Sequence, residues 1–246
     1  MTEDLIFYVV AGFLAQLIDG ALGMAYGVTA SSLLMSFGVP PAAASATVHA
    51  AECFTSGASA ISHHAFGNIS KNLFRRLLLP GVIGALIGAY VLTSLPGQAI
   101  KPWIAGYLLL LGVYIVVKAF LVFTPKEVTT YLSPLAFFGA FFDAIGGGGW
   151  GAIVTSNLLA RGHDLRETIG SVNAVEFFVT LASSAVFLAT LGLGHWKIIA
   201  ALALGGLLAA PLGGWLVGRV PRRPMMIAVG LLIVGLSART LWLALG

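Results

Sequence analysis

FLAQLIDGALGMAYGVTASSLL at positions 13–34 returns, 124 positions later, as FFGAFFDAIGGGGWGAIVTSNL at positions 137–158. The correspondence continues without a gap as far as Ser59 and Ser183. Identical pairs along it include Asp19/Asp143, Gly23/Gly147, Gly27/Gly151, Ser32/Ser156 and Glu52/Glu176. A chain with two copied halves, each with carboxylates inside apolar sequence, is typical of a membrane transporter.

The composition indicates that the lipid bilayer is the solvent of this chain. Of its 246 residues, 59% are hydrophobic and 9% are charged, whereas a soluble domain has about 25% charged residues. The first residues are acidic, so we expect the first apolar run to be retained rather than cleaved as a signal peptide. The net charge of +4 predicts no nucleic-acid partner. With Cys53 as the single cysteine, no internal disulfide is expected.

Apolar stretches alternate with turn signals along the whole chain. They are 5–36, 42–63, 73–94, 101–120, 131–160, 168–190, 197–218 and 225–245. The first and fifth stretches have about 30 residues, which as one helix would measure ~45 Å against a hydrocarbon core of ~30 Å. Both are interrupted by an aspartate followed by glycines, and four consecutive glycines disfavour a continuous helix. We therefore predict two short helices that meet at a bend inside the membrane; the alternative is one long, tilted helix with a glycine kink.

Basic residues distinguish between these alternatives. If both long stretches turn back, one membrane face receives ten basic residues and the other receives Lys101, Lys197 and Arg239. If both cross once, the split is six against seven. The positive-inside rule favours the first version, with the ten-residue face cytoplasmic and both termini outside. The ten are Lys71, Arg75, Arg76, Lys118, Lys126, Arg161, Arg166, Arg219, Arg222 and Arg223.

The predicted fold class is an all-α polytopic membrane protein made of two inverted repeats. Residues 1–123 form the first repeat and residues 124–246 the second, within one integral membrane domain. Each repeat has a broken or re-entrant helix pair followed by three transmembrane helices. Three net crossings are an odd number, so the second repeat enters from the opposite face.

The glycine bends are the predicted anion-binding site. A helix that starts behind each bend presents free N–H groups and a positive dipole end. The alternative is that these small residues only allow close helix packing. The candidate substrate-binding residues are Gly23, Tyr26, Gly27, Ser32, His49, Gly147, Gly148, Trp150, Gly151, Ser156, Asn157 and Asn173.

A polar stripe follows one face of the helix predicted at 42–63. It contains Ser45, His49, Glu52, Ser56, Ser59 and His63, at spacings of three and four residues. A carboxylate at mid-bilayer costs roughly 2.5–3.5 kcal/mol, so Glu52 and its counterpart Glu176 need hydrogen-bonding partners or a proton. They are candidate proton carriers, and a purely structural role is the alternative. His49 is a candidate proton carrier or anion contact, and a structural hydrogen-bonding role is the alternative for it as well.

Asp19 and Asp143 precede the bends, where a carboxylate can accept N–H bonds from the next helix, so both are predicted helix-break caps. The histidines outside the stripe have no cysteine or acidic cluster beside them, and no metal site or other cofactor is expected. Ser45 lies four residues from His49, but no nucleophile turn accompanies it, so the chain is not expected to be an enzyme.

Together these motifs resemble the TauE/SafE sulfite exporter family. The resemblance rests on the two glycine-rich stretches at 19–27 and 143–151, PPAAASATVH at 40–49, GSVNAVEF at 170–177 and two sets of helix glycines, and it covers nearly the whole chain. It implies a secondary transporter in a bacterial or archaeal cytoplasmic membrane. The implied function is export of a small inorganic or organic sulfur anion, such as sulfite or an organosulfonate. We expect the export to be linked to a proton or to the membrane potential. A passive channel for small anions is the alternative, and a homo-oligomer is compatible with the sequence.

Overall fold

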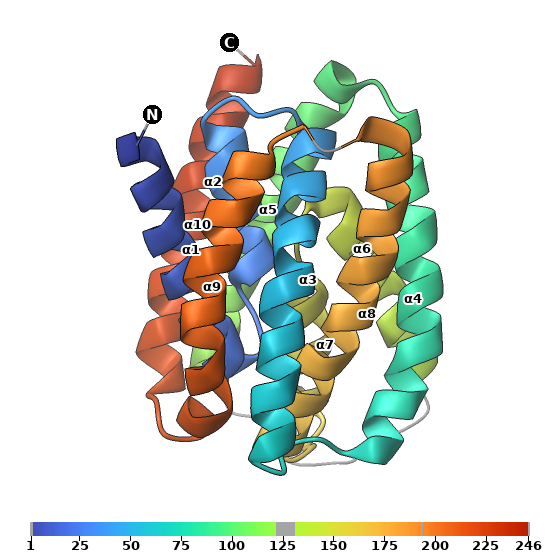
Figure 1. The fold of residues 1–246 in the computed structure, drawn as a ribbon, viewed down its shortest axis with the longest axis vertical. Helices are drawn as coiled ribbons and strands as arrows, with labels where there is room; N and C mark the ends of the chain where they lie inside the picture. Colours follow the sequence, from blue (N-terminus) through green and yellow to red (C-terminus); the bar gives the residue numbers. More distant parts are fainter. Residues whose placement is uncertain (1, 122–130, 193, 246) are drawn as a thin grey trace.

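The computed structural model describes residues 2–121, 131–192 and 194–245, and this part of the chain contains helices and no strand (Figure 1). The predicted all-α polytopic class is thereby confirmed. The helices are α1 Thr2–Leu22, α2 Tyr26–Ser36, α3 Pro41–Ala65, α4 Lys71–Ser94, α5 Gly97–Phe120, α6 Leu132–Gly146, α7 Trp150–Ala160, α8 Leu165–Leu191, α9 Trp196–Leu216 and α10 Arg222–Leu245.

Both long apolar stretches are broken at their glycines. The first break separates α1 from α2 and contains Gly23 at φ 68°, and the second separates α6 from α7 and contains Gly147 at φ 72°. Two positions further on, Ala25 has φ 110° and Gly149 has φ 143°. These angles lie in the region that glycine tolerates best, so Ala25 is held there by its surroundings at some cost in backbone strain.

The two broken pairs differ in length. Helices α6 and α7 have 15 and 11 residues, or about 22 and 16 Å, so neither crosses a ~30 Å core. Helix α2 also has 11 residues, but α1 has 21. Shifted back by the repeat offset of 124 positions, α6 corresponds to residues 8–22. Helix α1 is therefore longer than α6, and residues 2–7 are its additional stretch. The first pair is therefore one long and one short helix rather than the two short helices that we predicted.

Six described helices are long and apolar enough to cross a membrane: α1, α4, α5, α8, α9 and α10. Helix α3 has 25 residues but is absent from this set, because it has the polar stripe along its length. Its counterpart α8 has Ile169 and Phe187 where α3 has Ser45 and His63. The stripe is buried, whereas large apolar side chains face outward on the surrounding helices, among them Leu79, Ile83, Leu110, Leu204, Leu208 and Leu231.

The helices of the two halves are interleaved. Helix α1 packs against α9 and α6 packs against α4, which is the same contact with the halves exchanged, and α5 packs against its own counterpart α10. Glycines allow these close contacts: a Cβ on Gly20 of α1 would lie 2.7 Å from Cα of Gly213 of α9. In the middle, α3 and α8 contact each other and run in opposite directions (Figure 1).

Both chain ends lie at the same end of the bundle (Figure 1). The α1–α2 pair enters from this end, and the α6–α7 pair enters from the other (Figure 1). The two breaks therefore meet inside the bundle, beside the polar stripes of α3 and α8.

Candidate functional site

The two helix breaks cross in contact with each other, and each satisfies backbone groups of the other. Thr155 Oγ1 of α7 donates a hydrogen bond of 2.7 Å to the carbonyl of Gly23. The equivalent hydroxyl, Ser31 Oγ of α2, donates to the carbonyl of Gly147. A Cβ on Gly27 would lie 2.9 Å from Cα of Gly148, so the backbones touch at the crossing. Broken backbone at membrane depth needs such partners, and here the opposite repeat supplies them.

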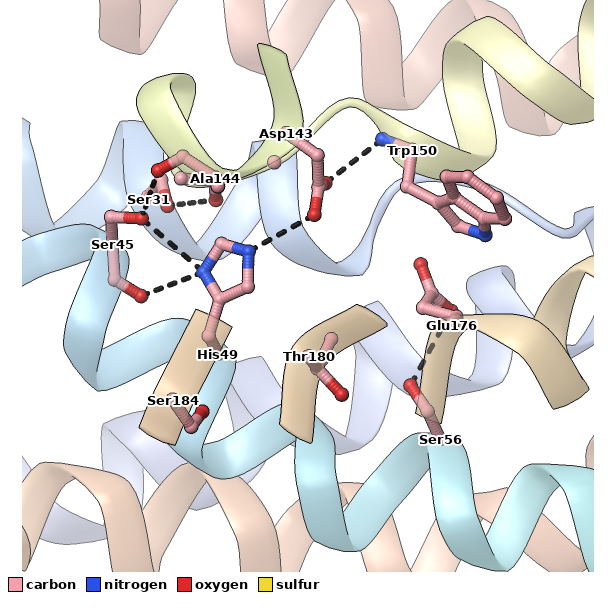
Figure 2. Close-up of polar contacts among 12 residues, drawn as sticks. Ser31, Ser45, His49, Ser56, Asp143, Ala144, Trp150, Glu176, Thr180 and Ser184 are labelled. Carbon is pink, nitrogen blue, oxygen red and sulfur yellow. Dashed lines mark hydrogen bonds and ion pairs between the residues drawn. The ribbon is translucent and has the colours of Figure 1, made fainter. Parts of the chain in front are cut away.

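Each break contains an aspartate that reaches the start of the following helix. Asp143 Oδ1 accepts a hydrogen bond of 2.8 Å from the amide of Trp150 (Figure 2). Asp19 Oδ1 accepts one of 3.5 Å from the amide of Tyr26. The positive ends of α7 and α2 thus face carboxylates of the protein itself. An anion can bind to these amides only when the aspartates release them.

His49 joins the first repeat to the aspartate of the second. Its Nε2 lies 3.0 Å from Asp143 Oδ2, and its Nδ1 lies 2.8 Å from the carbonyl of Ser45 (Figure 2). The Ser45 hydroxyl donates to the carbonyl of Ala144 at 2.7 Å. Ser45 Oγ also lies 3.2 Å from Nδ1. Where Nδ1 donates to the carbonyl, the Nε2–Oδ2 contact requires one further proton, on the imidazole or on the carboxyl group. The two side chains are therefore placed to share a proton.

The corresponding position in the second repeat is built differently. Asn173 donates to the carbonyl of Ile169 at 3.1 Å and accepts a hydrogen bond of 2.8 Å from Ser59. Asp19 Oδ2 is buried without a hydrogen-bond partner among the described residues. The centre thus has one aspartate with a titratable partner and one without.

Glu52 and Glu176 are buried in the same region, at 2% and 6% exposure. Glu176 Oε2 accepts a hydrogen bond of 3.3 Å from Ser56 (Figure 2), while Glu52 Oε2 has no hydrogen-bond partner among the described residues. Both glutamates interact electrostatically with Asp19 and with Asp143. Four carboxyl groups therefore share this centre, and in the described part of the chain no lysine or arginine forms an ion pair with them.

The other predicted site residues fall into two groups. Tyr26 and Trp150 are buried at the starts of α2 and α7, where Tyr26 Oη donates to the carbonyl of Leu202 at 3.2 Å and Trp150 Nε1 donates to that of Val172 at 3.1 Å. Gly151 of α7 packs its backbone against the first break.

Ser32, Ser156 and Asn157 lie further along the short helices, away from the crossing. Ser32 Oγ is 3.3 Å from the hydroxyl of Ser237 on α10. Ser156 and Asn157 contact Tyr114 on α5. These three residues therefore line helix contacts and not the space between the bends.

Some residues of the centre have no signal in the sequence. Tyr107 of α5 donates to the carbonyl of Gly148 at 3.2 Å, although it lies in an otherwise apolar helix. Gln16 and Thr55 are fully buried, and the polar atoms of their side chains have no hydrogen-bond partner among the described residues. A glutamine inside the apolar α1 is the one feature that a sequence search could have noted.

A cavity of about 340 Å³ leads toward this centre from the end of the bundle that holds the chain termini. It lies between α3, α8 and α9, and Phe187 is one of its lining residues. The ring of Phe187 packs against His49, with 5.7 Å between the ring centroids. One buried aromatic side chain therefore stands between the cavity and the His49–Asp143 pair.

Comparisons with known proteins agree with this architecture. The family model described as Sulfite exporter TauE/SafE matches residues 8–240. A protein of Bacillus subtilis (strain 168), described as "Probable membrane transporter protein YtnM", is 43% identical over 255 aligned positions, which cover 98% of this chain and 85% of that protein. The "Probable membrane transporter protein ORF9" of Sinorhizobium sp is 26% identical over 217 positions, covering 85% and 81%. No solved structure matches the chain.

Proposed function

This chain belongs to the sulfite exporter TauE/SafE family and is a membrane transporter, and from that premise we propose that it moves a small sulfur-containing anion together with a proton. The observation that carries the proposal is the 3.0 Å contact between His49 Nε2 and Asp143 Oδ2 at the crossing of the two breaks. The substrate class follows from the family, with sulfite and organosulfonates as the first candidates. The direction also follows from the family, and we infer export down an outward gradient of the anion.

The proton links to the anion through Asp143. Its Oδ1 accepts from the amide of Trp150 while its Oδ2 contacts His49. A proton that settles on Asp143 removes the negative charge from the start of α7 and weakens that hydrogen bond. The freed amide and the positive helix end then favour an anion oxygen. By linkage, a bound anion favours the proton to the same degree.

The buried carboxyl groups give a second reason for a linked proton. Asp19, Glu52, Asp143 and Glu176 surround the crossing. An anion that entered while they were ionised would meet like charges in a region of low dielectric. Protons on these groups remove that repulsion, so anion entry and proton uptake accompany each other.

We expect alternating access because helices of one half pack against helices of the other half, as α1 does with α9 and α4 with α6. We infer that the repeats are inverted, because α3 and α8 run in opposite directions and the broken pairs enter from opposite ends (Figure 1). In the conformation described here the glycine backbones touch at the crossing. Movement of one half against the other separates them toward one membrane face at a time. With the basic residues cytoplasmic, the chain termini are outside.

Proteoliposomes test the proposal. Uptake of labelled sulfite and sulfoacetate is measured at clamped membrane potential, with and without an inward proton gradient. We expect saturable uptake that the gradient accelerates. Asp143→Asn should fold, since an amide still accepts from Trp150 and donates to His49, but the gradient should no longer drive its transport. Asp164→Asn is the matched control, because Asp164 caps the exposed start of α8 far from the crossing.

Four results would contradict the proposal. Transport of neither anion by the wild-type protein would rule out the substrate class. Uptake that does not depend on the gradient, or an Asp143→Asn variant whose uptake still follows the gradient, would rule out the proton link. Flux that neither saturates nor responds to the gradient indicates a passive anion channel instead.

A further inference from the structure

A second cavity, with a polar wall, lies where α5 and α7 end and α10 begins. These helix ends are at the end of the bundle opposite the chain termini (Figure 1). Its volume is about 260 Å³. The residues that line it include Lys118, Arg222, Arg223, Ser156, Leu159 and Met226. No acidic residue is among the described residues of its wall. Arg222 and Arg223, beside a cavity whose described wall has no carboxylate, generate a local positive potential, which fits an anion.

The basic side chains are held in place by aromatic rings. The Lys118 ammonium lies 5.1 Å from the centre of the Tyr114 ring, and the Arg223 guanidinium lies 4.5 Å from that of Phe120. Arg222 Nε is buried and has no hydrogen-bond partner in the described part of the chain. A buried guanidinium N–H without an acceptor is unfavourable, and an anion oxygen in the cavity would supply that acceptor.

The inner wall of the cavity is connected through α7 to the His49–Asp143 pair. Ser156 donates to the carbonyl of Ala152, so the hydroxyl of Tyr114 donates to Ser156, at 2.9 Å. Ser156 belongs to α7, whose first amide is bound by Asp143. One short helix therefore has the cationic cavity beside its outer half and the His49–Asp143 pair at its start.

The repeat provides an internal comparison. At the offset of 124 positions, Lys118, Arg222 and Arg223 correspond to Trp242, Gln98 and Ala99. Ser156 corresponds to Ser32, which contacts Ser237 of α10. The equivalent place at the other end of the bundle thus lacks all three cations. The charge is a property of one end, and duplication of the fold does not account for it.

We propose that this cavity is a binding site for a small oxyanion, through which the substrate enters from the cytoplasmic face before it reaches the crossing. The proposal rests on the proposed function, which supplies the anion and the orientation. A lipid phosphate group shares the relevant chemistry, an oxyanion between guanidinium groups, and the experiment separates the two sources.

The experiment compares Arg222→Gln and the double variant Arg222→Gln/Arg223→Gln with the wild-type protein. Everted membrane vesicles expose the cavity, and initial rates of labelled sulfite uptake give KM and kcat. The expected result is a KM raised about tenfold in the double variant with kcat within about twofold, because the cations raise the local anion concentration. Added salt should raise the wild-type KM and leave that of the double variant nearly constant.

Arg219→Gln is the matched control. Arg219 lies at the same end of the bundle, is exposed and stacks on Trp215, with 4.8 Å from its guanidinium to the ring centre, and it does not line the cavity. Its removal changes the basic-residue count of that face as Arg222→Gln does, so an effect on topology would appear in both. Its KM should equal that of the wild-type protein.

The outcomes are distinct. An unchanged KM in the double variant, in vesicles where the wild-type protein transports, overturns the entry site and leaves the proposed function standing. The KM difference between the wild-type protein and the double variant is also compared in proteoliposomes of two lipid compositions. If it appears with anionic lipid and vanishes with zwitterionic lipid, the cavity binds a lipid headgroup, and the entry site is overturned. If the wild-type protein transports no sulfur anion, the proposed function fails. Equilibrium binding of labelled sulfite to the purified protein then tests the cavity directly, and equal binding by the wild-type protein and the double variant would refute it.

Discussion

Replacement of Asp143 by alanine removes two buried contacts at once. The first is the 2.8 Å hydrogen bond from the amide of Trp150, and the second is the 3.0 Å contact with His49 Nε2. A hydrogen bond to a charged group contributes about 1.5–3 kcal/mol, and a buried polar group without a partner costs about 1–3 kcal/mol. We expect Asp143→Ala to lower the free energy of unfolding by about 3–5 kcal/mol, the range for breaking a buried ion pair.

The duplicated sequence contains its own control for this change. Asp19 occupies the same position of the first repeat, but its hydrogen bond from the amide of Tyr26 measures 3.5 Å and its Oδ2 has no hydrogen-bond partner among the described residues. We expect Asp19→Ala to cost less than about 1 kcal/mol, because only one weak bond is lost. Asp143→Asn keeps both contacts in neutral form and should stay within about 1 kcal/mol of the wild-type protein.

Reversible unfolding in mixed micelles, followed by tryptophan fluorescence as the fraction of denaturing detergent rises, measures the three variants against the wild-type protein. The reasoning requires that Asp143→Ala is the least stable and that the other two lie near the wild-type protein. Equal destabilisation by Asp19→Ala and Asp143→Ala would refute it, since geometry at the two breaks would then be irrelevant. A loss in Asp143→Asn as large as in Asp143→Ala would refute the hydrogen-bond assignment around His49.

Two further predictions concern packing at the centre and access to it. Gly27→Ala places a Cβ 2.9 Å from Cα of Gly148, so we expect slower transport and about 1–3 kcal/mol of destabilisation from overpacking. Gly106→Ala in α5 is the control, because its Cβ meets no atom within 4 Å and should leave stability and transport unchanged. Thermal unfolding and sulfite uptake measure the two effects, and equal behaviour of the two variants would contradict the prediction. Phe187→Ala removes the ring between the 340 Å³ cavity and His49, so diethyl pyrocarbonate should modify His49 faster, as measured by peptide mass spectrometry, and an unchanged rate would show that the ring is no barrier.

Much of the fold follows from local signals in the sequence. The positions of the helix breaks were predictable because the consecutive glycines at 146–149 and the spaced glycines at 20–27 disfavour a continuous helix. The hydrogen bonds of Asp19 and Asp143 to the following helices also depend on neighbours only seven residues away. Such features need no knowledge of tertiary packing.

The remaining features depend on contacts between the halves. His49 and Asp143 are 94 positions apart, and nothing in either local sequence pairs them. Ser156 lies six residues into α7, or about 9 Å from the helix start, so it contacts Tyr114 of α5 rather than the bend, and its role in substrate binding stays a prediction. The length of α1 was missed because the two long stretches were treated as equal, whereas α1 has 21 residues and α6 has 15.

The differences between the repeats are what give this molecule a direction. Two identical halves related by inversion would offer the same site to both membrane faces, and the transporter would have no built-in preference for either. At the repeat offset, His49 corresponds to Asn173, and the three basic residues Lys118, Arg222 and Arg223 correspond to neutral residues. Both asymmetries involve α7, through its cap at Asp143 and through the cavity beside Ser156. In the proposed mechanism, an anion that binds at the cationic end reaches α7, whose first amide is bound by Asp143 of the His49–Asp143 pair. Among the described residues, α2 has neither such a pair nor a cationic cavity beside it.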